Sequence, residues 1–416
     1  MGGVTVDGGT GGITAHCDDL RTLARRLGEV SADTLHSAWS LHGYLAQPVL
    51  LESALLDPVG FATFEADLLL ALDGLHGLTP IGLRAAALDL ELRAAATAYE
   101  LADHLASDAI LGAIELPIAT QAASLALART RDPLGAAEQV VALDPALADT
   151  IIDGLGVPGL LASGARSLPD GHGVARPLGA DTGASTPPRR LTDVVADLDR
   201  RNADGHHGAV DVRILTLADG SRRAIVDITG TKSWSLGPTS DVTSLTTNGR
   251  ALVGLRTAYE QGVLAAMRAA GVRRTDQVML VGHSEGGMVA VTTARDAVTS
   301  GEFDVTHVVT AGSPVGLTVG QVPRQVQVLA LENTRDVVPH LDGRANPDQR
   351  NVTTASGARG DGTVGGDHSV HDAYLPLAGD VQTSHDRSVH DFLTGADGFF
   401  RAERVVTQTY QVIRTY

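Results

Sequence analysis

The chain contains almost no cysteine and very few aromatic residues. Cys17 is the single cysteine among 416 residues, so neither an intramolecular disulfide nor a cysteine-based metal cluster can form. Aromatic residues make up 3% of the chain and hydrophobic residues 43%, so the cores must be filled by Ala, Leu and Val. This composition favours helices that pack closely through small side chains.

Positive charge is also scarce. Asp and Glu number 49 against 32 Lys and Arg, which gives a formal net charge of -17. Such a surface repels the phosphates of nucleic acids and of anionic lipids, so we expect no nucleic-acid partner. The first residues lack a basic segment followed by an apolar run, and we therefore expect either a cytoplasmic protein or export without a Sec signal peptide.

The first part of the chain has the pattern of packed helices. Apolar residues recur at helical spacing over residues 12–48, 61–75 and 81–105. An apolar stretch at 108–129 contains Glu115, which would cost about 3 kcal/mol in the centre of a bilayer, so we expect a packed helix there and no membrane span. Together these segments predict an all-helical bundle domain over residues 1–162.

A change of pattern separates this region from the rest of the chain. Residues 163–190 are rich in Gly, Pro, Ser, Asp and Thr and lack a hydrophobic period, so they predict a linker. Over residues 191–416, apolar runs alternate with helical segments, which indicates an α/β domain whose mostly parallel sheet is covered on both faces. The runs expected to form strands are 209–215, 224–228, 278–281, 305–310 and 326–331.

A nucleophile motif follows one of these strands. The strand ending at Val281 leads into Gly282-His-Ser284-Glu-Gly286-Gly and then into a helix-forming segment, which is the strand, turn and helix order of a G-x-S-x-G nucleophile elbow. Glycine is needed at Gly282 and Gly286 because side chains there would strike the neighbouring strand or helix. We expect Ser284 to be a nucleophile; the alternative is an ordinary turn in which the serine caps the helix.

A serine nucleophile needs a base and an acid that orients the base. In this arrangement the chain order is serine, acid, histidine. Asp336 lies in the loop after the predicted strand 326–331, where residues of a parallel sheet gather into a site, and is the expected acid. Glu332 competes for this role from the same segment.

The candidates for the histidine that would act as base are His340, His368, His371, His385 and His390, of which only those after the last short strand, near residues 351–354, fit the expected chain order. His368 is the expected base because it lies in a loop directly before a helix that Ser369 caps. His371, in the first turn of the same helix, is the alternative base, whereas His385 and His390 fit better as solvated helix residues. The buried stripe of this helix would consist of Val370, Tyr374, Leu377 and Val381.

Two backbone N–H groups should stabilise the oxyanion that forms during acyl transfer. One is that of Glu285, directly after the nucleophile. The other is expected from the loop after strand 224–228, where Thr231 is the candidate; the alternative is an ordinary glycine turn with Trp234 packed over the sheet. No metal or organic cofactor is implied, because cysteine is nearly absent and no Gly-x-Gly-x-x-Gly loop opens a suitable helix.

These motifs resemble those of actinobacterial serine hydrolases of the α/β-hydrolase fold, a group of lipases and esterases. The matching segments are Gly230-Thr231-Lys-Ser-Trp234, Gly282-His-Ser284-Glu-Gly-Gly287 and Ala311-Gly-Ser-Pro314. Asp336-Val-Val-Pro339 is similar to the segment that carries the family's acid, and His368-Ser-Val with Tyr374 to the segment that carries its histidine. The resemblance covers Leu191 to the end and implies cleavage of a small-molecule or lipid ester through an acyl-enzyme.

The amino-terminal half loosely resembles type VII secretion substrates, which carry a Trp-x-Gly hairpin, although Trp39-Ser-Leu-His-Gly43 departs from that motif. This resemblance implies a secretion partner for the amino-terminal helices. A different class of function is a non-catalytic binding or secretion-associated protein that uses the hydrolase fold as a scaffold. That alternative predicts that Ser284 does not react with covalent probes.

Overall fold

The chain forms two compact units. The computed structural model describes residues 4–47, 50, 56–90, 92–93, 96–97, 170–178, 186–233 and 239–416. One unit spans Ile13–Ala113, and the other combines Met1–Gly12 with Ile114–Tyr416. The predicted domain boundary at residue 162 and the apolar stretch 108–129 lie outside the described residues, so both stay predictions. No helix in the described part of the chain is long and apolar enough to cross a membrane.

The described residues of the unit Ile13–Ala113 are mainly helical, as the apolar spacing predicted. Its elements are α1 (Ile13–His42), the short 3-10 helix η2 (Gly43–Ala46), α3 (Pro58–Asp73) and a further helical segment over residues 78–90. Helix α3 begins after Asp57, whose carboxylate accepts the N–H of Gly60 at 2.9 Å, a normal amino-terminal cap.

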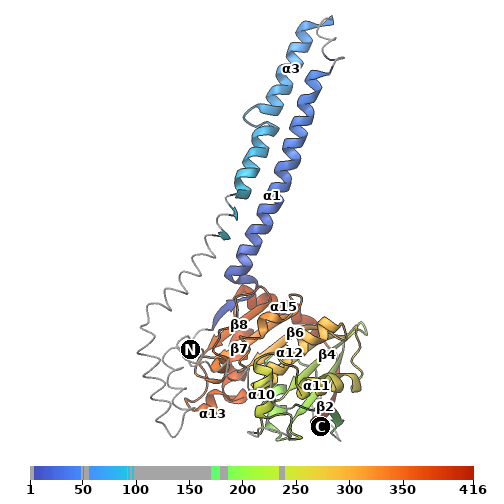
Figure 1. The fold of residues 1–416 in the computed structure, drawn as a ribbon, viewed down its shortest axis with the longest axis vertical. Coiled ribbons are helices and arrows are strands. Elements are labelled where there is room, and N and C mark those ends of the chain that lie inside the picture. The colour runs from blue at the N-terminus through green and yellow to red at the C-terminus, as the bar shows by residue number, and fades with distance from the viewer. Residues whose placement is uncertain are drawn as a thin grey trace. The chain divides into compact units, whose positions relative to one another are not determined.

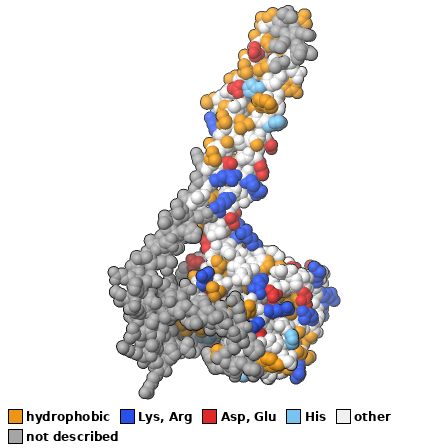
Figure 2. Space-filling model, viewed as in Figure 1, with side chains coloured by type: hydrophobic (Ala, Val, Ile, Leu, Met, Phe, Trp, Pro, Cys, Tyr) orange, Lys and Arg blue, Asp and Glu red, His pale blue; other side chains and the backbone are white. Residues whose placement is uncertain are grey.

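Small residues form the buried face of α1, which agrees with the expectation from composition. The buried side chains of this helix are Ala15, Cys17, Ala24, Ser31 and Ala38. Several of its larger apolar side chains lie on the surface instead, among them Leu23, Val30 and Trp39, and hydrophobic side chains are visible along these helices in Figure 2.

The second unit is built on a nine-stranded sheet in the order β1-β8-β7-β6-β5-β4-β3-β9-β2. Strands β4 to β8 are parallel, and β3, β9, β2 and the opposite edge strand β1 pair antiparallel to their neighbours. The strands are β1 (Thr5–Gly8), β2 (His172–Pro177), β3 (Ala209–Thr216), β4 (Arg222–Ile228), β5 (Gln277–His283), β6 (Asp304–Ala311), β7 (Gln327–Asn333), β8 (Val352–Gly357) and β9 (Arg404–Thr415). The mostly parallel central sheet is therefore confirmed.

Both outer edges of the sheet come from segments that the sequence did not assign to it. Strand β1 comes from the region predicted as an all-helical domain, and β2 lies within the range 163–190 predicted as a linker. Their short lengths and polar or glycine content give weak local signals, and backbone pairing with β8 and β9 places them in the sheet.

Helices cover both faces of the sheet (Figure 1). One face carries α10 (Leu245–Leu252), α11 (Ala258–Ala269) and α12 (Glu285–Ser300). The other carries α9 (Leu191–Ala203), a π-helical turn (Val370–Tyr374), α14 (Leu375–Gln382) and α15 (Arg387–Phe400). The predicted stripe Val370, Tyr374, Leu377 and Val381 is buried on this second face.

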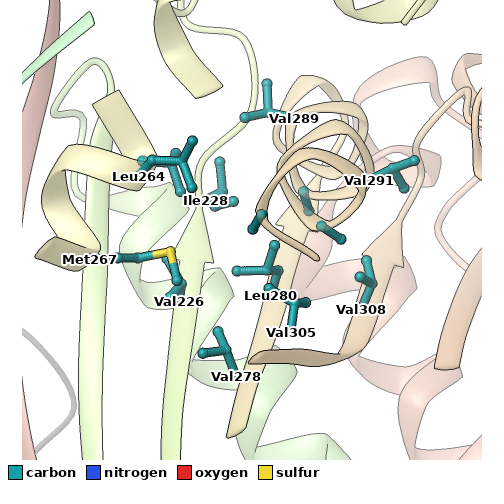
Figure 3. Packing of buried hydrophobic residues seen from close by; sticks show 14 of the residues in the cluster. Val226, Ile228, Leu264, Met267, Val278, Leu280, Val289, Val291, Val305 and Val308 are labelled. Atoms are coloured by element: carbon teal, nitrogen blue, oxygen red, sulfur yellow. The ribbon is translucent and has the colours of Figure 1, made fainter. Parts of the chain in front are cut away.

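The core below α12 is made almost entirely of aliphatic side chains. Successive residues of a strand point to opposite faces, so Leu280 of β5 joins the cluster around α12 while Val281 joins the opposite cluster. Figure 3 shows residues of this cluster, with Val289 and Val291 on α12 and Leu280, Val305 and Val308 on the strands. This packing fixes the start of α12 relative to the end of β5.

Candidate active site

Ser284 lies in a strained turn between β5 and α12. Its backbone has φ 55° and ψ -123°, and it is the only residue other than glycine with positive φ among the described residues. A side chain in this region costs roughly 1–3 kcal/mol and is found mostly at functional sites. The N–H of Ser284 donates to the carbonyl of Ala311 at 2.9 Å, which ties the turn to the end of β6.

The glycines of this turn are required by close backbone approach, as the motif predicted. A Cβ added to Gly282 would lie 2.2 Å from the carbonyl oxygen of Gly286, and one added to Gly286 would lie 2.2 Å from that of Ile228. Both distances are far below a normal contact, so any other residue would force the backbone apart. The turn therefore packs directly against the end of β4.

Asp336 and His368 are brought together at the same edge of the sheet. Asp336 follows β7 and is buried, and its Oδ2 lies 2.6 Å from Nδ1 of His368. His368 directly follows the short helix α13 (Val364–Asp367), and its side chain is 22% exposed. A carboxylate on Nδ1 fixes the tautomer in which Nε2 is free to accept a proton.

The other candidate residues lie in different surroundings. The side chain of His371 is 73% exposed, and its Nδ1 lies 3.0 Å from Asp199 Oδ2, which raises the pKa of the imidazole. His385 and His390 are exposed. Glu332 belongs to β7 itself and accepts a hydrogen bond from Asn346 Nδ2 at 2.6 Å.

His283, the residue before the nucleophile, contacts His368 directly. Its Nε2 lies 2.9 Å from the carbonyl oxygen of His368, and the two rings are 4.5 Å apart between centroids. Burial, and then the neighbouring His368, hold the pKa of His283 well below its usual range, so its imidazole is neutral and donates from Nε2. The contact places the His368 loop beside the nucleophile turn.

Tyr374 donates a second hydrogen bond to the acid. Its hydroxyl lies 2.6 Å from Oδ2 of Asp336, and the N–H of Val338 donates to Oδ1 at 2.9 Å. Burial, followed by the charge of Asp336, raises the pKa of Tyr374 well above its usual range, so the phenol keeps its proton. The sequence identified Tyr374 as a buried stripe residue and as part of the segment that resembles the family's histidine segment, but it gave no signal of this hydrogen bond.

The loop after β4 lies against the nucleophile turn. A Cβ added to Gly230 would lie 3.1 Å from the Cβ of Ser284. The N–H groups of Lys232 and Ser233 donate to the carbonyl of Thr243, and that of Gly230 donates to Asn202 Oδ1. Trp234 lies outside the described residues, so its expected packing over the sheet stays a prediction.

The two backbone groups predicted for the oxyanion hole have no hydrogen-bond partner within the described part of the chain. These are the N–H groups of Thr231 and Glu285, whereas the N–H groups on both sides of Thr231 are bonded. Because Gly230 is packed against Ser284 and Glu285 follows it, both free donors belong to segments that flank the serine. Such donors are suited to an anionic oxygen formed at the serine.

Among the described residues, no group of three or more His, Cys, Asp or Glu side chains is arranged to hold a metal ion. Residues 257–397 match the model of a family described as PGAP1-like alpha/beta domain. No curated protein matches the chain. The family match and the mostly parallel sheet are consistent with an α/β-hydrolase domain; they support a serine-hydrolase-like fold and suggest hydrolase activity. The matched segment includes Ser284, Asp336 and His368 but not Thr231.

Proposed function

We propose that the α/β-hydrolase domain is a serine esterase with Ser284 as nucleophile, His368 as base and Asp336 as the orienting acid. The observation that carries the proposal is the strained turn of Ser284 beside the hydrogen-bonded pair of His368 and Asp336. These groups follow β5, α13 and β7 and converge at one edge of the sheet. That edge lies at the carboxyl ends of the parallel strands, where sites of this architecture form.

The reaction follows from the roles of these groups. Ser284 Oγ attacks the ester carbonyl carbon while its proton passes to Nε2 of His368, and Asp336 stabilises the resulting imidazolium. The carbonyl oxygen becomes an anion that the N–H groups of Glu285 and Thr231 stabilise. The tetrahedral intermediate collapses, His368 gives its proton to the leaving alcohol, and water then cleaves the acyl-enzyme by the same steps in reverse order.

The substrate class is a small-molecule or lipid ester. A hydrolase domain of this kind suggests a small-molecule substrate, and acyl transfer by serine needs no cofactor. The helical unit Ile13–Ala113 is outside the family match and carries no residue of the proposed mechanism.

Covalent labelling with a fluorophosphonate probe tests the proposal. We expect the wild-type protein to be labelled and Ser284→Ala and His368→Ala to lose labelling. His371→Ala is the matched control: this exposed histidine is paired with Asp199, so its removal should leave the labelling rate within about twofold. A folded wild-type protein that is not labelled would refute the enzyme and favour the non-catalytic scaffold.

A further inference from the structure

Glu285 has a buried side chain that reaches away from its own helix. It is the first residue of α12, and its side chain is fully buried. Its Oε2 accepts a hydrogen bond from the hydroxyl of Thr231 at 2.8 Å, across 54 residues of sequence. The Glu285 side chain therefore holds Thr231, whose backbone N–H is the other proposed oxyanion donor.

A third side chain completes this connection. Asn248 of α10 donates from Nδ2 to the hydroxyl of Thr231 at 2.9 Å. A hydroxyl that accepts this bond still has its own hydrogen to give, and the nearest acceptor is Glu285 Oε2. Thr231 is thus held through its side chain from α10 and α12, while its N–H has no partner within the described residues.

The surroundings of Glu285 favour its neutral form. Burial raises the pKa of this carboxyl well above its usual range, and Asp241 raises it further. The hydroxyl of Thr231, the charge of Arg414 and the backbone of Ser244 oppose the shift. The buried phenol of Tyr259, whose pKa is raised by burial and also by the charge of Glu285, keeps its proton and bonds Thr229. The buried cation Arg414 directs its N–H groups to other acceptors, namely Asp170, the carbonyls of Thr239 and Asp241, Ser244 and Thr247.

We propose that Glu285 is a positioning residue whose side chain, through its hydrogen bond to the Thr231 hydroxyl, fixes Thr231 so that the N–H groups of both residues meet the oxyanion. The inference rests on the proposed esterase function. A neutral acid serves this purpose better than a carboxylate, because a negative charge one residue from the nucleophile would oppose the charge that develops on the substrate. The acid acts through Thr231 and does not touch the substrate.

Two matched pairs of variants test this role. Glu285→Leu removes the hydrogen bond at similar size, whereas Glu285→Gln keeps a neutral acceptor at the same place. Thr231→Val removes the hydroxyl but keeps the backbone N–H, whereas Thr231→Ser restores the hydroxyl. The kinetic constants are measured on a p-nitrophenyl ester that the wild type cleaves, together with the melting temperature of each variant.

We expect Glu285→Leu and Thr231→Val to lower kcat by about 10- to 100-fold with little change in KM, since a displaced donor costs less than the roughly 10²- to 10³-fold of a deleted one. The kcat of Glu285→Gln should be at least tenfold higher than that of Glu285→Leu, and the kcat of Thr231→Ser at least tenfold higher than that of Thr231→Val. A merely structural role would lower the melting temperature without this separation of kcat from KM.

The outcomes separate this inference from the function on which it rests. Normal kcat in Thr231→Val, or loss of kcat in Glu285→Gln equal to that in Glu285→Leu, would overturn the positioning role and leave the esterase standing. If Glu285→Leu does not fold, Thr231→Val decides the question. A wild type without turnover and without fluorophosphonate labelling would overturn both.

Discussion

Replacing Asp336 by asparagine tests whether the carboxylate orients the base through the hydrogen bonds that it accepts. All three groups around this carboxylate donate: Val338 N–H to Oδ1, and His368 Nδ1–H and Tyr374 O–H to Oδ2. A carboxylate accepts all three, but an amide has one oxygen and one NH₂ group. The asparagine side chain would therefore leave two donors facing each other on one side, whichever way its amide points.

We expect the amide oxygen to face Val338, because a backbone N–H can only donate, whereas a phenol and an imidazole can also accept. The amide NH₂ group then faces His368 and Tyr374. The imidazole can accept from it only if Nδ1 carries no proton, and this tautomer inactivates the base. The proton then sits on Nε2, so the base has no lone pair for the serine proton. The expected loss in kcat is roughly 10³- to 10⁴-fold, which corresponds to about 4 to 5.5 kcal/mol of transition-state stabilisation.

The rate of fluorophosphonate labelling and the kcat for a p-nitrophenyl ester measure this loss, and a thermal melt checks the fold. Glu332→Gln is the matched control, because this competing acid bonds Asn346 and should change the labelling rate by less than about threefold. If Asp336→Asn kept a labelling rate within tenfold of the wild type, the tautomer argument would be wrong. A large loss in Glu332→Gln instead would transfer the role of acid to Glu332.

Three further predictions concern stability. Tyr374→Phe should lower the free energy of unfolding in urea by about 1.5–3 kcal/mol, because a buried hydrogen bond to the Asp336 carboxylate is lost. Burial lowers the pKa of His307 to about 4, so the unfolded chain binds a proton at higher pH than the folded protein does. Up to about 3 kcal/mol of the free energy of unfolding should therefore be lost as pH falls from 6.5 toward 4. Thermal melts from pH 4 to 7 should show a smaller pH dependence for His307→Gln. Ser284→Gly should be more stable than Ser284→Ala by about 1 kcal/mol. Glycine relieves roughly 1–3 kcal/mol of backbone strain at this positive φ, but part of this gain is offset because glycine raises the entropy of the unfolded chain. Equal stabilities of the two variants would contradict the strain.

The sequence predicted the central strands and the nucleophile turn because their signals are local. Apolar runs mark β4 to β7 within a few residues, and the glycines around Ser284 identify a turn that tolerates no other residue. The edge strands were missed because a short polar or glycine-containing segment becomes a strand only through its partner. Helical spacing also overestimated how far the large apolar residues of α1 are buried, since small side chains fill its inner face.

The candidate site was less accessible to sequence reasoning because its contacts are long-range. His368 and His371 stand three positions apart at one helix start, so spacing separates them weakly. The structure distinguishes them because His368 meets buried Asp336, whereas His371 is itself exposed and meets half-buried Asp199. The hydroxyl of Tyr374 reaches Asp336 across 38 residues. No periodicity or local motif encodes that distance, so such partners emerge only when the sheet brings loop ends together.

The nucleophile turn also holds the separate segments of the candidate site in their positions relative to one another. His283 bonds the carbonyl of His368, Ser284 N–H bonds Ala311, and Glu285 bonds Thr231, so three consecutive residues each contact a different segment. Because the strained backbone of Ser284 fixes the directions of its neighbours, a change in the turn would displace base and oxyanion donors together. Substitutions at His283 and Glu285 should therefore not combine additively in kcat, since both act through this one turn.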